Sequence, residues 1–87
     1  MPVYVYMVQC GDGSYYTGWT DDVEKRVQVH QSGKGAKYTR GRGPIALVWY
    51  EQVEDKSTAL KREIEIKKWP KAKKEKLILI YKGEKDE

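Results

Sequence analysis

Two short runs of β-branched and aromatic residues, joined by a glycine turn, most constrain how this chain can fold. Residues 3–10 are almost wholly apolar or aromatic and include three valines, a composition typical of a strand buried on both faces. The turn signal Gly11-Asp12-Gly13-Ser14 follows, and residues 15–19 resume with tyrosine, threonine and tryptophan. The pattern predicts a β-hairpin, but its loop leaves open which side chains of the two strands share a face.

Helical patterns and one more strand follow the hairpin. Asp21, with Glu24 three residues later, is typical of a helix N-terminus, and Ser32-Gly33 is expected to end that helix. The rest of the pattern predicts a glycine-rich loop over 32–43, a strand over 45–50, a helix over 56–68 opened by Asp55 or Ser57, and a last helix over about 70–81.

The predicted order of elements, β-β-α-β-α-α, indicates an α/β (α+β) fold. We expect a small three-stranded antiparallel or mixed sheet flanked by helices. With 87 residues the chain is expected to form one domain over residues 1–82. A flexible C-terminal tail over residues 83–87 completes the prediction.

Positive charge is segregated along the chain, which carries a net charge of +4. No acidic residue occurs between Lys25 and Tyr50. A second basic stretch lies where the helix predicted over 56–68 gives way to the last predicted helix. Such segregation is typical of a protein that binds a polyanion, although a solvated basic surface is an alternative. The candidate nucleic-acid contacts are Lys34, Lys37, Arg40, Arg42, Lys71 and Lys74.

The remaining composition restricts the cellular setting. The single cysteine, Cys10, excludes an internal disulfide and a multi-cysteine zinc site. No apolar run approaches the length of a membrane span, and the N-terminus has no signal-peptide pattern. We therefore expect a cytoplasmic protein without a membrane partner.

Four residues in predicted elements are candidates for one site: Tyr16, Arg26, His30 and Glu63. Glu63 lies within the apolar arc of its predicted helix, where an ionised carboxylate needs a cation. That cation is either Arg26, in an ion pair, or a divalent metal ion. Arg26 suits bidentate phosphate recognition, whereas His30 is either a hydrogen-bonded core residue or a ligand for phosphate or water.

The order of these residues resembles the GIY-YIG nuclease family, in particular its small stand-alone bacterial members, over about residues 3–80. The first motif corresponds to Tyr4-Val5-Tyr6, with tyrosine in place of the family's glycine, and the second to Tyr16-Thr17-Gly18. The family's arginine, helix histidine and metal-binding glutamate fall on Arg26, His30 and Glu63. Many members also have a late asparagine, and this chain contains no asparagine.

The resemblance implies hydrolysis of phosphodiester bonds in DNA, in a repair or recombination setting, with a single Mg²⁺ or Mn²⁺ ion. Tyr16 would act as general base, Arg26 would stabilise the phosphate and Glu63 would bind the metal, with Tyr6 supporting the site. The alternatives are a non-catalytic nucleic-acid-binding module of the same fold, and a protein whose activity or specificity needs a protein partner.

Overall fold

A computed structural model of the chain describes residues 2–85. Its elements are β1 (Val3–Gln9), β2 (Tyr15–Thr20), α1 (Val23–Gln31), the 3-10 helix η1 (Lys37–Thr39), β3 (Ala46–Val53), α2 (Lys56–Lys67) and α3 (Lys71–Lys85). The strands form one sheet in the order β2-β1-β3, and both pairings are antiparallel. The α+β class and the element order are thus confirmed, with an antiparallel rather than a mixed sheet.

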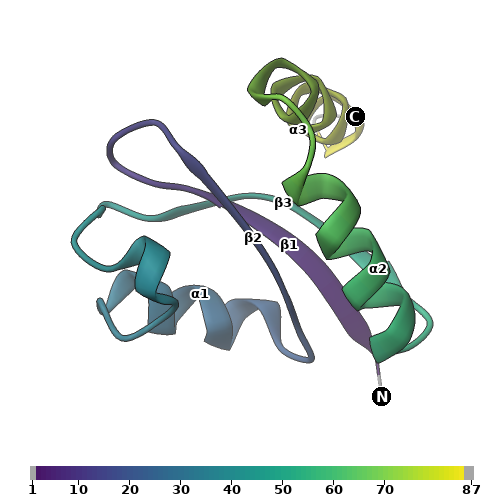
Figure 1. Ribbon diagram of the computed structural model, residues 1–87, viewed down its shortest axis with the longest axis horizontal. Coiled ribbons are helices and arrows are strands. Elements are labelled where there is room, and N and C mark those ends of the chain that lie inside the picture. The colour runs from purple at the N-terminus through teal and green to yellow at the C-terminus, as the bar shows by residue number, and fades with distance from the viewer. Residues whose placement is uncertain (1, 86–87) are drawn as a thin grey trace.

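Helices cover both faces of the sheet, so the central strand β1 is buried on both sides, as its sequence predicted. Figure 1 shows α1 on one side of the strands and α2 and α3 on the other. Alternate residues of β1 therefore enter two separate cores. The core under α2 and α3 consists of Val5, Met7, Trp49, Ala59, Ile66 and Ile78, and the core under α1 consists of Tyr6, Val8, Cys10, Val27 and Ile45.

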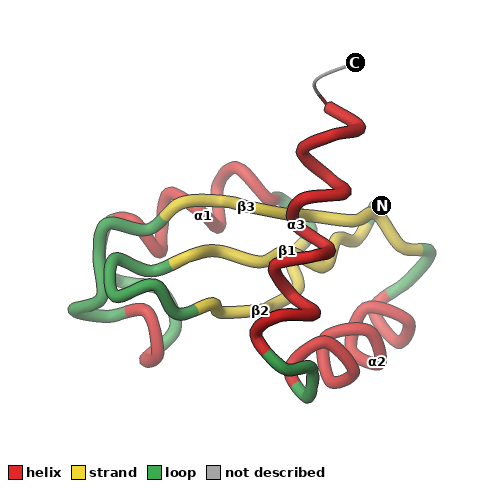
Figure 2. The backbone as a smooth tube through the Cα atoms, turned by 90° about the horizontal axis from the view of Figure 1, so that it is seen from above, coloured by secondary structure: helices red, strands yellow, loops and turns green. Residues whose placement is uncertain are grey.

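The position of α2 matters for the site because this helix lies beside the edge strand β2. Its closest packing is against β2, followed by β1, whereas α3 crosses toward β3 (Figure 2). Ala59 and Ile66 anchor α2 in the core and are fully buried. Glu63 lies between these two anchors along α2 and is partly exposed.

The N-terminus of α1 differs from the prediction by one residue. Asp22, not Asp21, caps the helix: its side chain accepts a hydrogen bond from the backbone N–H of Lys25 at 3.1 Å. A capping carboxylate serves the N–H three residues later, so this choice moves Glu24 out of the reciprocal capping position. Glu24 remains in the first turn, where its negative charge interacts favourably with the positive end of the helix dipole.

The later elements run longer than the sequence indicated. Strand β3 continues to Val53 because Val53 pairs with Val3 at the far end of β1. Helix α3 extends to Lys85, four residues beyond its predicted end; residues 86 and 87 of the predicted tail lie outside the described residues. Between positions 2 and 85, no helix is both long and apolar enough to cross a membrane.

Candidate active site

The register of the hairpin places Tyr6 and Tyr16 on the same face of the sheet. Tyr6 pairs with Gly18, and Val8 pairs with Tyr16. Directly paired residues share a face, as do residues two apart on one strand. Both phenol-bearing side chains therefore lie on the α1 side, which the loop of the hairpin had left undecided in the sequence.

Gly18 provides the space in which the Tyr6 ring lies. A Cβ atom at position 18 would be 2.7 Å from the Tyr6 hydroxyl oxygen and 2.9 Å from Cζ. No side chain can occupy that volume without moving the ring. The glycine of the Tyr16-Thr17-Gly18 motif thus allows the phenol to pack directly over the edge strand β2.

His30 forms a buried hydrogen bond with the Tyr6 hydroxyl. The two side chains are 1% exposed, and the Tyr6 oxygen lies 2.7 Å from Nε2 of His30. Burial lowers the pKa of His30, and the charge of Arg26 lowers it further. The imidazole is therefore neutral around pH 7, and the interpretation of His30 as a hydrogen-bonded buried histidine accounts for its contacts.

Arg26 and Glu63 both act on the Tyr6 phenol. Burial raises the pKa of Tyr6 above its usual value, and a hydrogen bond from Arg26 opposes that rise. Tyr16 and the charge of Glu63 raise the pKa further, while the guanidinium charge lowers it. The structure therefore brings together all five residues named from the sequence, from β1, β2, α1 and α2, around a single hydroxyl group.

Tyr16 lies between two aromatic neighbours and a lysine. Its ring centroid is 5.4 Å from that of His30 and 5.9 Å from that of Tyr38, with which it stacks. Nζ of Lys67 lies 5.4 Å from the Tyr16 centroid. Lys67 thus makes a cation–π contact with the Tyr16 ring.

Glu63 forms its ion pair with Lys67 rather than Arg26. In the described part of the chain, Oε1 of Glu63 lies 2.8 Å from Nζ of Lys67, one helical turn away, and no ion pair joins Glu63 to Arg26. The Glu63 side chain is 14% exposed, so one edge of the carboxylate is accessible. Of the two cations that the sequence left open, Arg26 is not the ion-pair partner; Lys67, four residues later on the same face of α2, takes that place.

The donor set near Glu63 fits a single hydrated divalent ion and no larger cluster. Among residues 2–85, no three histidine, cysteine, aspartate or glutamate side chains gather as a metal site. Mg²⁺ is commonly held by one or two carboxylates, with water and substrate phosphate completing its shell. Glu63, whose side chain is 14% exposed, can supply one such carboxylate.

The residues predicted to contact nucleic acid differ in their exposure to solvent and in their contacts within the protein. Lys34, Lys37 and Arg40 are exposed on the loop after α1. Nζ of Lys71 lies 5.8 Å from the Tyr15 ring centroid, next to the hairpin, and Lys74 is half-buried on α3. These contacts remain predictions.

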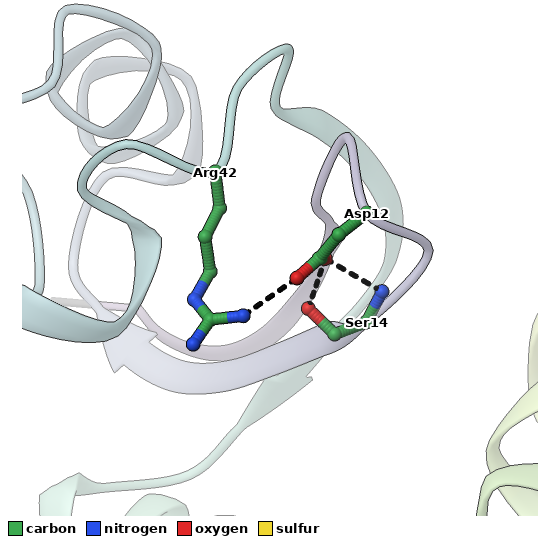
Figure 3. Close-up of polar contacts among 3 residues, drawn as sticks. All are labelled: Asp12, Ser14 and Arg42. Atoms are coloured by element: carbon green, nitrogen blue, oxygen red, sulfur yellow. Dashed lines mark hydrogen bonds and ion pairs between the residues drawn. The ribbon is translucent and has the colours of Figure 1, made fainter.

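Arg42 is partly occupied by contacts within the protein. Its Nη1 lies 2.6 Å from Oδ2 of Asp12, while Ser14 donates two hydrogen bonds to the same carboxylate (Figure 3). Those bonds from Ser14, followed by the contact with Arg42, lower the pKa of Asp12 to about 2. The guanidinium also lies 4.5 Å from the Tyr38 ring centroid. Arg42 therefore connects the hairpin turn to the loop that carries Tyr38.

Three contributors to the site were not identified from the sequence as site residues. Lys67 could have been found from its four-residue spacing to Glu63 on one helix face. Tyr38 and Thr39 lie in η1, and no local pattern announces that their loop folds back over His30. Only the tertiary structure reveals them.

Comparison with known proteins gives a consistent result. Residues 2–76 match the family model for the GIY-YIG catalytic domain. A UPF0213 protein of Staphylococcus saprophyticus is 55% identical over 86% of this chain and 92% of its own length. A UPF0213 protein of Haloquadratum walsbyi is also 55% identical, over 85% of this chain and 83% of its own.

Two solved structures have the same fold. The solution NMR structure of a UPF0213 protein from Bacillus halodurans superimposes with a TM-score of 0.58 at 50% identity, covering 92% of this chain and 85% of that one. The solution NMR structure of a protein from E. faecalis gives a TM-score of 0.62 at 37% identity, over 93% and 86%.

Proposed function

Because this chain belongs to the GIY-YIG domain family, we propose that it is a nuclease that hydrolyses phosphodiester bonds with the help of one divalent metal ion. The family implies binding to nucleic acid, and its nucleases generally depend on a divalent metal. We propose DNA as the substrate, with repair or recombination as the setting, and Mg²⁺ or Mn²⁺ as the ion.

The observation that carries this proposal is the convergence of four kinds of functional group on the Tyr6 hydroxyl. A phenol of β2, a guanidinium and an imidazole of α1, and a carboxylate of α2 act on it. Such a concentration of titratable groups around one buried phenol is typical of a functional site. Catalysis of phosphoryl transfer needs this combination, because charge develops on the attacking water, the phosphate and the leaving oxygen.

Each residue has a distinct role in this mechanism. Arg26 binds the scissile phosphate through its forked N–H donors. Tyr16 accepts a proton from the attacking water, and the Lys67 ammonium group lies over its ring. Tyr6, hydrogen-bonded to His30, holds these groups in position. Glu63 would hold the divalent ion, which supplies charge stabilisation at the leaving oxygen when bound.

Exposed cations next to the site supply non-specific affinity. Lys34, Lys37 and Arg40 lie on the loop that contributes Tyr38 to the site, and Lys71 lies beside the hairpin. Each phosphate that such a residue neutralises releases a counterion. Binding to DNA should therefore weaken steeply as salt rises, even for variants that cannot cut.

A substitution of one hydroxyl group tests the proposed base. Tyr16→Phe should lower the rate of DNA cleavage in Mn²⁺ by roughly 100-fold or more, the usual contribution of a general base. Tyr15→Phe is the matched control, because Tyr15 is the neighbouring residue and packs against the opposite core. Equal rates for the two variants would overturn the role of Tyr16.

A second candidate function is a nucleic-acid-binding module that does not cut. It is favoured by the complete absence of asparagine and by Tyr4 at the glycine position of the first motif. In that case the wild-type protein binds DNA with a steep salt dependence but leaves plasmid and branched substrates intact in both Mg²⁺ and Mn²⁺. Cleavage that depends on Tyr16 excludes this alternative.

A further inference from the structure

Thr39 makes the second hydrogen bond of the buried histidine. Its Oγ1 lies 2.9 Å from Nδ1 of His30 and 2.9 Å from the backbone oxygen of Ala36. Thr39 is 2% exposed and His30 is 1% exposed. Water therefore has no access with which to replace either contact, and each polar atom depends on the partner that the fold provides.

The chemistry of these atoms determines the direction of each hydrogen bond that connects Ala36, Thr39, His30 and Tyr6. The Ala36 carbonyl oxygen can only accept, so the Thr39 hydroxyl proton points to it. The Thr39 oxygen is then an acceptor for Nδ1–H of His30. A neutral imidazole carries a single N–H, so Nε2 is unprotonated and accepts the hydrogen bond from the Tyr6 hydroxyl.

The surrounding loop holds Thr39 in this position. The backbone N–H of Thr39 donates to the same Ala36 oxygen at 3.0 Å, and its carbonyl accepts from Arg42 at 3.2 Å. Gly35 lies so close to His30 that a Cβ atom there would overlap the imidazole. The loop from Gly35 to Arg42 thus packs against the His30 ring, and this packing fixes the orientation of the Thr39 hydroxyl.

We propose that Thr39 is a positioning residue that keeps His30 in the Nδ1–H tautomer and thereby turns the Tyr6 O–H inward. The Tyr6 oxygen then presents its lone pairs to Arg26 and to the site. With the opposite tautomer, Nε2–H would donate to that oxygen, and the phenol proton would point into the site instead. The catalytic consequence rests on the proposed nuclease function, whereas the tautomer assignment does not.

Long-range ¹H–¹⁵N NMR spectra test the assignment directly, because protonated and unprotonated imidazole nitrogens have well-separated ¹⁵N shifts. His30 is the only histidine of the chain, so its two nitrogens are unambiguous. At neutral pH the wild-type protein should show a protonated Nδ1 and an unprotonated Nε2. A protonated Nε2 in the wild type would overturn the proposal without any variant.

Two substitutions of similar shape isolate the hydroxyl. Thr39→Val removes the acceptor, so we expect the Nε2–H tautomer, and Thr39→Ser should keep the Nδ1–H form. Thr17→Val is the control: Thr17 is equally buried, its Oγ1 has no partner among the described residues, and it lies on the opposite face. A Thr39→Val spectrum identical to the wild-type spectrum would overturn the proposal.

Cleavage assays then separate this role from the proposed function. Thr39→Val should cut DNA roughly tenfold more slowly, the lower end of the effect of losing a partner that orients a site histidine, and Thr39→Ser should restore the rate. A switched tautomer with unchanged cleavage would overturn the positioning role. A wild-type protein that does not cut would overturn the nuclease function, while the tautomer result would still decide the assignment of Thr39.

Discussion

Gly18 lies directly across the β1–β2 ladder from Tyr6, and the absent side chain of Gly18 is the space that the Tyr6 ring occupies. The phenol packs over Gly18, with its hydroxyl 2.7 Å from the place of the missing Cβ. The two motifs thus depend on each other: the tyrosine of the first needs the glycine of the second.

Gly18→Ala should therefore displace Tyr6 and disrupt the site. The added methyl group overpacks a filled space, so we expect a loss of about 1–3 kcal/mol in the free energy of unfolding together with loss of the Tyr6–His30 hydrogen bond. Gly83→Ala is the control, because position 83 is helical with nothing within 4 Å. There alanine should stabilise by about 0.5–1 kcal/mol. Urea unfolding of both variants measures the difference.

The Tyr6 hydroxyl should contribute to stability through His30. Tyr6→Phe leaves the buried Nε2 without a donor, which costs about 1–3 kcal/mol. Tyr4→Phe, two residues earlier on the same strand, alters a half-buried ring that packs edge-on against Tyr50. That change should remain within about 0.5 kcal/mol of the wild type. Equal losses in the two variants, measured by chemical denaturation, would contradict the contact described here.

The buried His30 predicts a pH dependence of stability. Because its folded pKa is lowered by burial and by Arg26, the unfolded chain binds the proton first as pH falls. Its contribution is complete above the unfolded value of about 6.5 and is lost as pH falls from there toward the folded pKa. The free energy of unfolding should decline over this range in the wild type. In His30→Gln the decline should be smaller, and an identical decline would count against the lowered pKa.

Asp12 should titrate at about 2, because Ser14 and Arg42 stabilise its ionised form. Its lowered pKa means that its contribution to stability is present above the unfolded value of about 3.8 and is lost as pH falls toward 2. Ser14→Ala removes the hydroxyl hydrogen bond, which is the largest single contribution, and Arg42→Ala removes the guanidinium, so each substitution should raise the pKa of Asp12. Carbon-detected NMR titration of the Asp12 carboxyl group measures both variants, and an unchanged pKa in either would contradict this account.

Local patterns predicted the helices and strands well because the signals for each element lie within a short stretch of sequence. The apolar run of β1 announced burial on both faces, and the order β-β-α-β-α-α followed from turn and cap signals. The choice of Asp22 over Asp21 as cap was missed because both residues are competent acceptors next to the same helix. A shift of one residue there depends on the geometry of the preceding strand end.

The sequence named residues that the fold brings together, but it did not indicate which of them pair. Tyr6, Tyr16, Arg26, His30 and Glu63 were all named from the sequence, and their side chains do converge. Which of them pair could not be read, because contacts across 24 positions, such as Tyr6–His30, depend on tertiary packing. The Glu63–Lys67 ion pair could have been predicted from its four-residue spacing on a helix. The hydrogen bond between Thr39 and His30 could not, because Thr39 lies in a loop without a periodic pattern.

Cleavage by two matched glutamine variants tests the central claim most directly. Glu63→Gln removes the carboxylate proposed to hold the metal, whereas Glu65→Gln removes an exposed carboxylate of the same helix that pairs with Arg62. With branched DNA and Mn²⁺ at low salt, the wild type and Glu65→Gln should cut at similar rates, and Glu63→Gln should lose cleavage while retaining DNA binding. Equal cleavage by Glu63→Gln and Glu65→Gln would contradict the proposed active site.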